Sequence, residues 1–266
     1  MLNEITANQL MRLIGTPDAP VIVDVTIDED FNADPFLIPT AFRHKHTELE
    51  SLLPLLNGRK TIIICQKGKK LSQGTAAWLR AQGIDAENLT GGNFAWRDTA
   101  NAPRTAQSVL PATGTAWVTR QRPKIDRLAC PWLITRFVDP RASFLYVAPA
   151  SVLDVAEKFG ALSYDANGAA FSHEDSGCTF DTLLKHFTLS TPALEKMAEV
   201  IRAADLGKLA DAPEAAGLLA LSVGLSKQHS DDNQQLAAAL PLYDALYRWA
   251  RDGSGETHAS QLGDTA

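Results

Sequence analysis

The first hundred residues alternate between short apolar runs and amphipathic segments. Val21-Ile22-Val23 and Thr61-Ile62-Ile63-Ile64 are rich in β-branched residues, as buried parallel strands are. Residues 72–82 place apolar side chains on one face and end before Gly83, which predicts a helix with glycine just past its last turn. Because strands alternate with helices, residues 1–98 are predicted to form an α/β domain with a parallel sheet.

Some helix starts are predicted from capping boxes, in which a polar cap residue and a Glu or Gln three positions later bind each other's backbone. The pairs with this spacing are Thr6 with Gln9, Thr47 with Glu50, and Asp211 with Glu214.

From about residue 99 to 115 the chain is rich in Ala, Pro, Thr and Ser without periodicity, which predicts a linker. Residues 116–251 are predicted to form a second, mainly α-helical domain with a few short strands, and the polar stretch 252–266 a disordered tail. The predicted elements are a strand at 144–147 and helices at 126–137, 151–159, 179–187, 191–204, 211–225 and 240–251.

Composition agrees with two domains, because 266 residues exceed the usual size of one. The net charge of −6 argues against general nucleic-acid binding. Three widely separated cysteines suit a reducing compartment better than a disulfide framework. The N-terminus lacks the features of a signal peptide, and no apolar run is long enough for a membrane span. We therefore expect a cytoplasmic protein with neither membrane nor nucleic acid as a partner.

One short segment predicts a reactive thiol. Cys65 ends an apolar strand, and the basic loop Gln66-Lys67-Gly68-Lys69-Lys70 leads from it into a helix. Backbone N–H groups of such a loop, together with the helix dipole, form a cradle for an anion and favour a thiolate. Cys65 is the candidate nucleophile, and residues 66–70 are the candidate substrate-binding residues.

Several phrases in residues 1–98 resemble the rhodanese domain of sulfurtransferases. They are Val21-Ile22-Val23-Asp24-Val25, Leu37-Ile38-Pro39-Thr40-Ala41, Cys65 to Lys70, Ala76-Ala77-Trp78-Leu79 and Leu89-Thr90-Gly91-Gly92. Thr26 and Lys70 stand where arginine is usual, which affects substrate preference more than fold.

The resemblance implies that Cys65 takes sulfur from thiosulfate or a similar anionic donor and forms a persulfide, which cyanide or a thiol then removes. The six-residue loop, which no arginine closes, distinguishes this pattern from the related phosphatases with longer loops. Sulfur transfer of this kind requires no cofactor.

Residues 116–251 resemble the C-terminal domain of ChrB-type chromate-resistance proteins. The longest matching phrase runs from Trp117 to Ile134, and further phrases follow in order. They are Phe144 to Val147, His173-Glu174, Cys178 to Asp181, and Asp211 to Ala215. The resemblance implies detoxification of chromate or a related oxyanion, so chromate is a candidate ligand.

Two constellations in this region are candidate sites. Arg120, Arg122, Lys124 and Arg127 form either an oxyanion patch or a solvated basic face, with Asp126 as a helix cap. The second set suits zinc, iron or manganese, with His173 and Glu174 as the leading ligands. Its other members are Asp175, Cys178, Asp205, Glu214, His229, Asp231 and Asp232.

Simpler interpretations assign Glu214 to its capping box, the Asp231-Asp232 pair to a solvated helix end, and Cys130 to the core. Three functional hypotheses follow. The leading one is a rhodanese-type sulfurtransferase fused to a chromate-resistance domain. The others are a non-catalytic sensor of persulfide or oxyanion, and metal-dependent redox chemistry in the helical domain.

Overall fold

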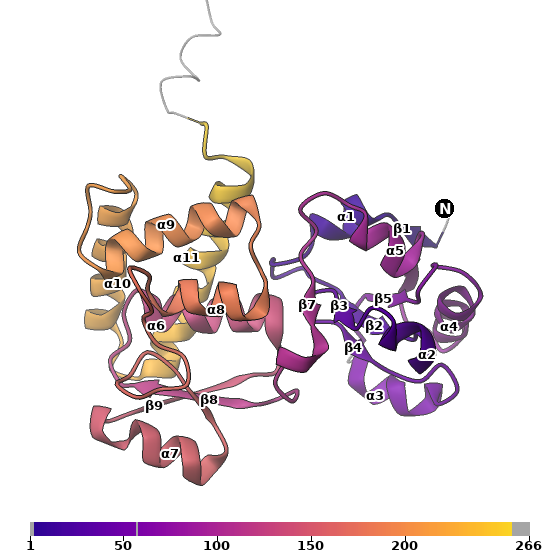
Figure 1. Ribbon diagram of the computed structural model, residues 1–266, viewed down its shortest axis with the longest axis horizontal. Coiled ribbons are helices and arrows are strands. Elements are labelled where there is room, and N and C mark those ends of the chain that lie inside the picture. The colour runs from indigo at the N-terminus through magenta and orange to yellow at the C-terminus, as the bar shows by residue number, and fades with distance from the viewer. Residues whose placement is uncertain (1–2, 57, 257–266) are drawn as a thin grey trace, which may run out of the picture. The chain divides into compact units, whose positions relative to one another are not determined.

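The computed structural model of the chain describes residues 3–56 and 58–256 (Figure 1). Within them the chain forms two compact units. The first contains the described residues up to 115 together with 133–143 and 185–189, and the second contains the remainder. The sequence predicted domains that are contiguous along the chain, whereas these compact units are interleaved.

The N-terminal part has the predicted alternation of strands and helices. Its elements are β1 (Glu4–Ile5), α1 (Ala7–Met11), β2 (Val21–Asp24), α2 (Asp28–Asn32), β3 (Phe36–Leu37), β4 (Phe42–Arg43), α3 (Leu53–Leu56), β5 (Thr61–Ile64), α4 (Lys70–Ala81), β6 (Ala86–Leu89), α5 (Gly92–Arg97) and β7 (Thr105–Ala106).

Five of these strands form a sheet in the order β1-β6-β5-β2-β4, and every neighbouring pair is parallel. The central strands β2 and β5 are in register from Val21 opposite Thr61 to Asp24 opposite Ile64. One face of the sheet packs on α3 and α4, where Val23 and Ile63 lie in one apolar cluster with side chains of both helices. Figure 1 shows α1 and α5 on the other side of the sheet from α3. The predicted α/β architecture with a parallel sheet is confirmed.

The predicted helix starts in this part are only partly correct. The capping box of Thr6 and Gln9 is present at the start of α1. The box predicted at Thr47 is wrong, because a 3-10 turn begins at Leu49 with Glu48 as its N-cap and no side-chain cap. Helix α4 begins at Lys70, two residues earlier than the sequence indicated.

The segment predicted as a linker contains ordered structure. β7 pairs antiparallel with β3, with Leu37 opposite Thr105. The Thr105 hydroxyl also donates to the carbonyl oxygen of Phe187, 2.9 Å away in the same compact unit. Short two-residue strands have no periodicity that a sequence pattern could reveal.

The C-terminal part is mainly helical, as predicted. Its elements are β8 (Ala116–Arg120), α6 (Asp126–Leu133), a π-helical turn (Ile134–Val138), β9 (Ser143–Val147), α7 (Val152–Phe159), β10 (Leu162–Ser163), α8 (Thr179–Phe187), α9 (Pro192–Asp205), α10 (Ala215–Gln228) and α11 (Asp232–Asp252).

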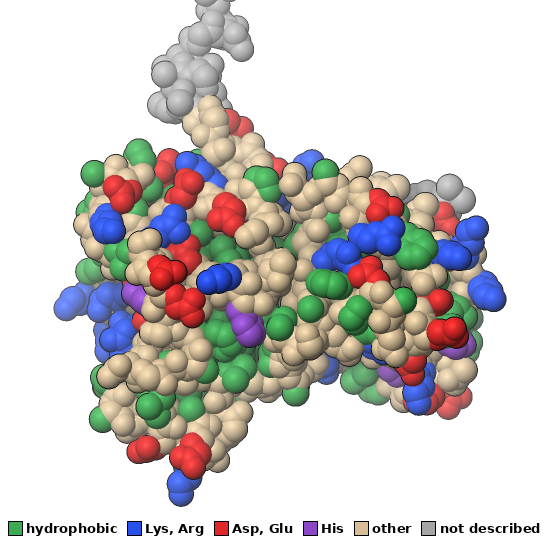
Figure 2. All heavy atoms as spheres, in the orientation of Figure 1, with side chains coloured by type: hydrophobic (Ala, Val, Ile, Leu, Met, Phe, Trp, Pro, Cys, Tyr) green, Lys and Arg blue, Asp and Glu red, His purple; other side chains and the backbone are tan. Residues whose placement is uncertain are grey.

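A three-stranded sheet in the order β10-β8-β9 lies between helices. α7 covers one side, where Val152 packs with Val118, and α6 and α8 lie on the other side (Figure 1). Helix α9 packs against α10 and α11. Acidic side chains gather on the visible face over α8 and α9 (Figure 2). The hydrophobic core of this part contains large aromatic side chains that are fully buried, among them Trp117, Trp132 and Phe180.

Two helix starts differ from the prediction. α10 begins at Ala215 with Glu214 as N-cap and no side-chain cap, so the box predicted from Asp211 is wrong. Pro213 disfavours helical backbone at the residue before it, which prevents an earlier start. α11 begins at Asp232 rather than near 240, and the Asp231 side chain caps it by accepting from the N–H of Gln234 at 2.8 Å.

Residues 257–266 of the predicted tail lie outside the described residues. Within residues 3–56 and 58–256, no helix combines the length and the apolar character that crossing a membrane requires.

Candidate functional site

Cys65 lies at the point where the order of the parallel sheet changes direction. β5 and β2 are neighbours, and the chain continues from them toward opposite edges of the sheet. At such a point the loops after the two strands separate and leave a crevice at their carboxyl ends. Cys65 follows β5 directly, and Val25 and Thr26 follow β2. The fold therefore places the predicted nucleophile where an open parallel sheet binds its ligand.

The loop after Cys65 is held by a close approach of two backbone segments. Gly68 and Gly92 both have positive φ angles, of 64° and 59°. A Cβ atom on Gly92 would overlap the Cys65 carbonyl oxygen and the Gly68 nitrogen. The Cys65 carbonyl also accepts the N–H of Asn93 at 3.1 Å. Glycine is therefore required at both positions, and the close packing fixes the path of the loop.

The thiol of Cys65 is 5% exposed and lies beside a hydroxyl that the sequence analysis did not single out. Its Sγ is 3.2 Å from the Oγ of Ser72, which is buried in the first turn of α4. The Ser72 hydroxyl is also 3.1 Å from the Lys69 carbonyl, to which it can donate. A serine two residues into a helix has no signal that separates it from an ordinary first-turn residue.

The predicted substrate-binding residues of this loop differ in exposure. Lys67, Lys69 and Lys70 are exposed, and Gln66 is half-buried. The first N–H groups of α4 have no acceptor within the helix, as at any helix start. Exposed lysine charges are screened by salt, so they attract an anion but fix its position weakly. The roles of Cys65 and of residues 66–70 stay predictions.

A polar network borders the loop. Asn93 donates through Nδ2 to the Asp24 carboxylate at 2.9 Å and to the Thr26 hydroxyl at 3.2 Å. Thr26, which stands at the position where the resemblance expects arginine, also donates to Asp24 through its hydroxyl. Arg43 donates to the Thr26 carbonyl at 2.9 Å and to Asp28 at 2.7 Å. The guanidinium of Arg43, from the neighbouring strand β4, thus lies next to the backbone of Thr26.

A second constellation forms in the helical region around Asp126, the first residue of α6. Its carboxylate is fully buried and accepts the N–H groups of Thr179 and Phe180, at 2.8 and 3.0 Å, in the first turn of α8. The thiol of Cys130 donates to the same carboxylate at 3.0 Å. Asp126 therefore stabilises the start of a helix distant in sequence, in addition to its place at the start of its own.

Three carboxylates surround one nitrogen of His173. Nε2 lies 3.3 Å from an oxygen of Asp126, 3.3 Å from one of Asp165 and 3.4 Å from one of Asp205. Asp126, His173 and Asp205 each offer one ligand atom within 4.8 Å of the other two. The His173 side chain is 37% exposed, so solvent reaches the group.

The pKa values of Asp165, His173 and Asp205 are all raised above their usual values. Burial and the nearby Asp126 and Asp165 carboxylates raise the pKa of Asp205 to about 6. Burial and Asp126 also raise the pKa of Asp165. A hydrogen bond to Asp126 raises the pKa of His173. Negative charge is thus concentrated in a partly desolvated space.

Two of the four predicted basic residues meet at this group. Arg120 and Arg127 both contact Asp165 Oδ2, at 2.8 and 3.1 Å. Arg122 instead donates to the His229 carbonyl at 2.8 Å and to the Ser226 hydroxyl at 3.2 Å. The Arg122 side chain therefore binds the end of α10, and the predicted four-residue patch is only partly assembled. Lys124 is half-buried and lies outside the group that contacts Asp165.

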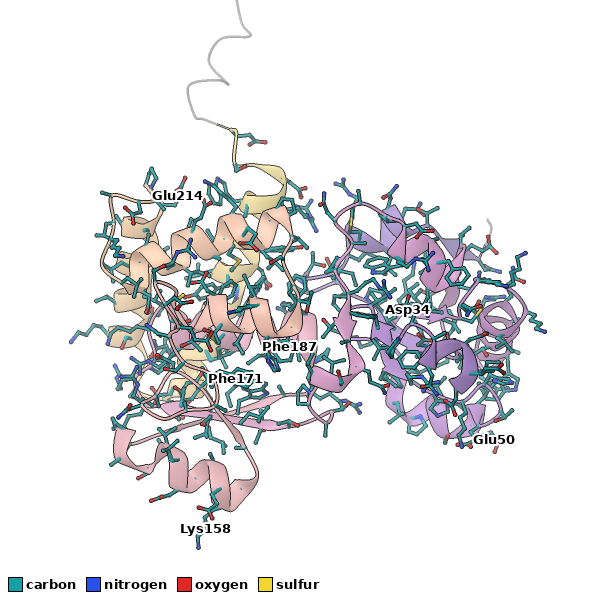
Figure 3. The ribbon with its side chains drawn as sticks, viewed as in Figure 1. Asp34, Glu50, Lys158, Phe171, Phe187 and Glu214 are labelled. Atoms are coloured by element: carbon teal, nitrogen blue, oxygen red, sulfur yellow. The ribbon has the colours of Figure 1, made fainter. Side chains whose placement is uncertain are left out.

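The metal ligands predicted from sequence are also only partly brought together. His173 and Asp205 meet, whereas Glu174 is exposed and lies outside the group. Figure 3 shows Glu214 at the edge of the helical region, well away from Phe171, which precedes His173 by two residues. Among the other predicted members, Asp231 caps α11, and Asp232 accepts from the Arg122 N–H at 3.1 Å. Cys130 and Cys178 are fully buried, and burial raises the pKa of each thiol.

Asp126 and Asp165 are the members that the sequence analysis did not include among the metal ligands. Asp126 was considered as a helix cap, and Asp165 follows a short strand without any motif. Only a positive φ of 44° marks Asp165, and a backbone angle is visible in structure alone.

Known protein families match both parts of the chain. The family profile of the ChrB C-terminal domain matches residues 117–250. The chain belongs to this family. The profile of the rhodanese-like domain matches residues 6–99, which is the part that carries Cys65. Both resemblances stated from the sequence are confirmed.

Each similar protein aligns with only part of this chain, and this chain spans less than half of the length of the curated relative. Protein ChrB of Cupriavidus metallidurans is 35% identical over 136 residues, which are 50% of this chain and 40% of that protein. A rhodanese-like domain protein of Staphylococcus aureus is 32% identical, with a TM-score of 0.32, over 38% of this chain and 95% of its own. A possible tyrosine phosphatase of Rhodopseudomonas palustris is 25% identical, with a TM-score of 0.34, over 38% and 83%.

Proposed function

We propose that this protein is a sulfurtransferase that carries sulfane sulfur as a persulfide on Cys65. The observation that carries the proposal is the position of this thiol between β5 and the start of α4, in a loop fixed by Gly68 and Gly92. The match of the rhodanese-like domain to residues 6–99 supports the same chemistry.

The transfer has two steps. The Cys65 thiolate attacks the outer sulfur of thiosulfate, a new S–S bond forms, and sulfite leaves with the electron pair of the broken bond. Cyanide or a thiolate then attacks the outer sulfur of the persulfide, and the Cys65 thiolate is released. Amides at the start of α4 stabilise the negative charge on the persulfide, and Lys67, Lys69 and Lys70 attract the anionic donor.

Ser72 has a defined part in this proposal. Its hydroxyl, 3.2 Å from Sγ, can donate to the thiolate and stabilise the charged form. It can also donate to the outer persulfide sulfur by rotation about its side-chain bond.

The proposal places this activity in resistance to chromate or a related oxyanion. The support is membership of the ChrB C-terminal domain family. Chromate and thiosulfate are both tetrahedral dianions, so the cradle above Cys65 suits either one by charge and shape.

A persulfide carrier without rapid turnover is the second candidate. It is favoured by the burial of Cys65, whose exposed fraction is 5%. A thiol that is nearly closed off retains sulfur until a partner or a loop movement exposes it.

The test is the fate of sulfur on the intact protein. We expect mass spectrometry after incubation with thiosulfate to show one added sulfur atom on Cys65, removable by cyanide with formation of thiocyanate. Cys65→Ser should take up no sulfur, and Cys130→Ser, a control at a buried cysteine of the other compact unit, should take up sulfur as the parent does. Sulfur uptake by Cys65→Ser would refute the role of Cys65. Uptake without turnover would identify the carrier.

A further inference from the structure

Four side chains of the helical region converge in a way that neither sulfur transfer nor local stability explains. Asp126 comes from α6, Asp205 from the end of α9, and Asp165 and His173 from the chain between β10 and α8. Residues from three separate segments of the chain thus meet at a single imidazole nitrogen.

The distances do not describe ordinary hydrogen bonds. Nε2 of His173 carries at most one hydrogen, which can point well at one acceptor only. Yet three carboxylate oxygens lie at nearly equal distances of 3.3, 3.3 and 3.4 Å, all longer than the usual range. Four ligand atoms placed tetrahedrally around a zinc ion, at about 2.0–2.1 Å from it, lie about 3.3–3.4 Å from one another. The distances from Nε2 to Asp126 and Asp205 therefore match those between neighbouring ligand atoms of a tetrahedral zinc ion, and the three donor atoms lie within 4.8 Å of one another.

The negative charges of Asp126 and Asp205 are also not neutralised by arginine or lysine among the described residues. Asp165 is paired with Arg120 and Arg127, whereas among the described residues no arginine or lysine forms an ion pair with Asp205. Asp126 is fully buried, and its charge is met only by neutral N–H groups, by a thiol and by His173. Among the described residues His173 is the one basic side chain paired with both Asp126 and Asp205. Buried charges are either paired or bound to metal ions, so two carboxylates that share one imidazole suit a metal ion.

A separate observation concerns a residue that is bound to the Asp126 carboxylate. Thr179, whose N–H binds the Asp126 oxygen that faces His173, is itself fully buried. Its hydroxyl has no hydrogen-bond partner within the described part of the chain. A buried hydroxyl without a partner is costly, so a water or another ligand is expected next to it.

We propose that Asp126, His173 and Asp205 bind a divalent first-row transition-metal ion. The donors are one imidazole and two carboxylates without a thiolate, a set that zinc, manganese and iron accept. The distances of 3.3 and 3.4 Å from Nε2 to the two carboxylate oxygens match a tetrahedral zinc ion. Three protein ligands leave one coordination position open, as in catalytic rather than structural zinc sites. Asp165 is oriented by Arg120 and Arg127 and has an oxygen 3.3 Å from Nε2, so it can accept a hydrogen bond from a water in the fourth position.

The site differs from the one expected from sequence, and the difference can be tested. The sequence named His173 with Glu174, whereas the structure replaces Glu174 by Asp126 and Asp205. Glu174→Gln should therefore keep the metal, and Asp205→Asn should lose it.

The experiment uses the full chain without an affinity tag, stripped with EDTA and dialysed. Calorimetric titration with zinc chloride should show one ion per chain. Asp205→Asn and His173→Gln should weaken binding more than about 100-fold, since even outer partners of metal ligands contribute 10–100-fold. Asp175→Asn is the matched control, because it removes a carboxylate two residues from His173 at an exposed position that accepts asparagine. It should bind zinc as the parent does.

Several outcomes would overturn the proposal. They are a parent protein that binds no stoichiometric zinc or manganese, an Asp205→Asn variant that binds within a few-fold of the parent, and equal losses in Asp205→Asn and Asp175→Asn. Far-UV circular dichroism of each metal-free variant shows whether it is folded, so that a lost site is separated from a lost fold. Tighter binding of manganese chloride than of zinc chloride would overturn the tetrahedral assignment.

Discussion

At the scale of single residues, the chemistry of this protein depends on side chains that are held in place by backbone groups. The Asp126 carboxylate accepts two N–H groups at the start of α8, and Ser72 is fixed between the Cys65 thiol and the Lys69 carbonyl. Such contacts matter because a functional group must be held to within about 0.5 Å of its working geometry. They are also the features that a sequence pattern does not reveal.

The first residue-scale prediction concerns stability and pH. The pKa of Asp205, normally 3.8, is about 6 in the folded protein. A carboxyl whose pKa rises on folding favours the native state below its unfolded pKa, and this contribution is lost as pH rises through about 6. Raised pKa values at Asp165 and His173 act in the same direction. The metal-free protein should therefore be weakened by this group between about pH 4 and pH 7.

Asp205→Asn isolates the effect, because asparagine mimics the protonated acid. In EDTA its unfolding temperature should equal that of the parent near pH 4. At pH 7.5 it should exceed the parent's by about 2–4 °C, which corresponds to about 1 kcal/mol after allowance for partial exposure of the carboxylate. Scanning calorimetry across this pH range checks the result. A variant that is less stable than the parent at pH 7.5 without metal would contradict it.

At the scale of elements, the loop between β5 and α4 depends on contact with the start of α5. Gly92 lies against the Cys65 carbonyl, and Gly68 lies against the Leu89 carbonyl. The two glycine backbones thus pack against each other and against the Cys65 carbonyl. The sequence placed a Gly-Gly pair after a strand, but it did not show that the pair faces the cysteine loop.

Gly92→Ala tests this contact. Its added methyl group would overlap backbone atoms of Cys65 and Gly68, so we expect a loss of more than about 4 kcal/mol in unfolding free energy and loss of sulfur uptake. Gly83→Ala is the control, since Gly83 also has a positive φ, of 81°, but nothing lies within 4 Å of an added Cβ. That variant should lose only about 1–2 kcal/mol and keep its activity. Denaturant unfolding of both variants measures the difference, and equal losses would refute the steric account.

At the scale of the whole molecule, the two sites belong to different compact units. Cys65 and its loop lie in the first unit, and Asp126, His173 and Asp205 lie in the second. No residue is common to both sites. The proposed sulfur transfer and the proposed metal site are therefore expected to work independently in the isolated chain.

Independence has two consequences that can be measured. Removal of metal with EDTA should leave the extent of thiosulfate-dependent persulfide formation unchanged within about twofold. Cys65→Ser should bind zinc with the affinity of the parent, as measured by calorimetry. Loss of persulfide formation on chelation would show instead that the metal takes part in sulfur transfer.

Much of the fold follows from the sequence for a simple reason. In long amphipathic helices the spacing of apolar residues indicates which face is buried, and β-branched runs such as 61–64 indicate buried strands. The parallel sheet and most helices were therefore predictable. The cysteine loop was also predictable, because its strand, basic turn and helix are contiguous. Predicted helix boundaries were wrong where another residue opposed the capping signal. At α10, Pro213 prevents the start that the Asp211 and Glu214 pair indicated.

The candidate metal site was decided by tertiary structure alone. Asp126 and His173 are 47 residues apart in the sequence, and His173 and Asp205 are 32 residues apart. Asp126 resembles an ordinary helix cap, and Asp165 belongs to no motif. A ligand set of this kind has no spacing rule, because its geometry depends on how α6, α8 and α9 pack around one loop. The sequence determined which groups were available, and packing determined which of them meet.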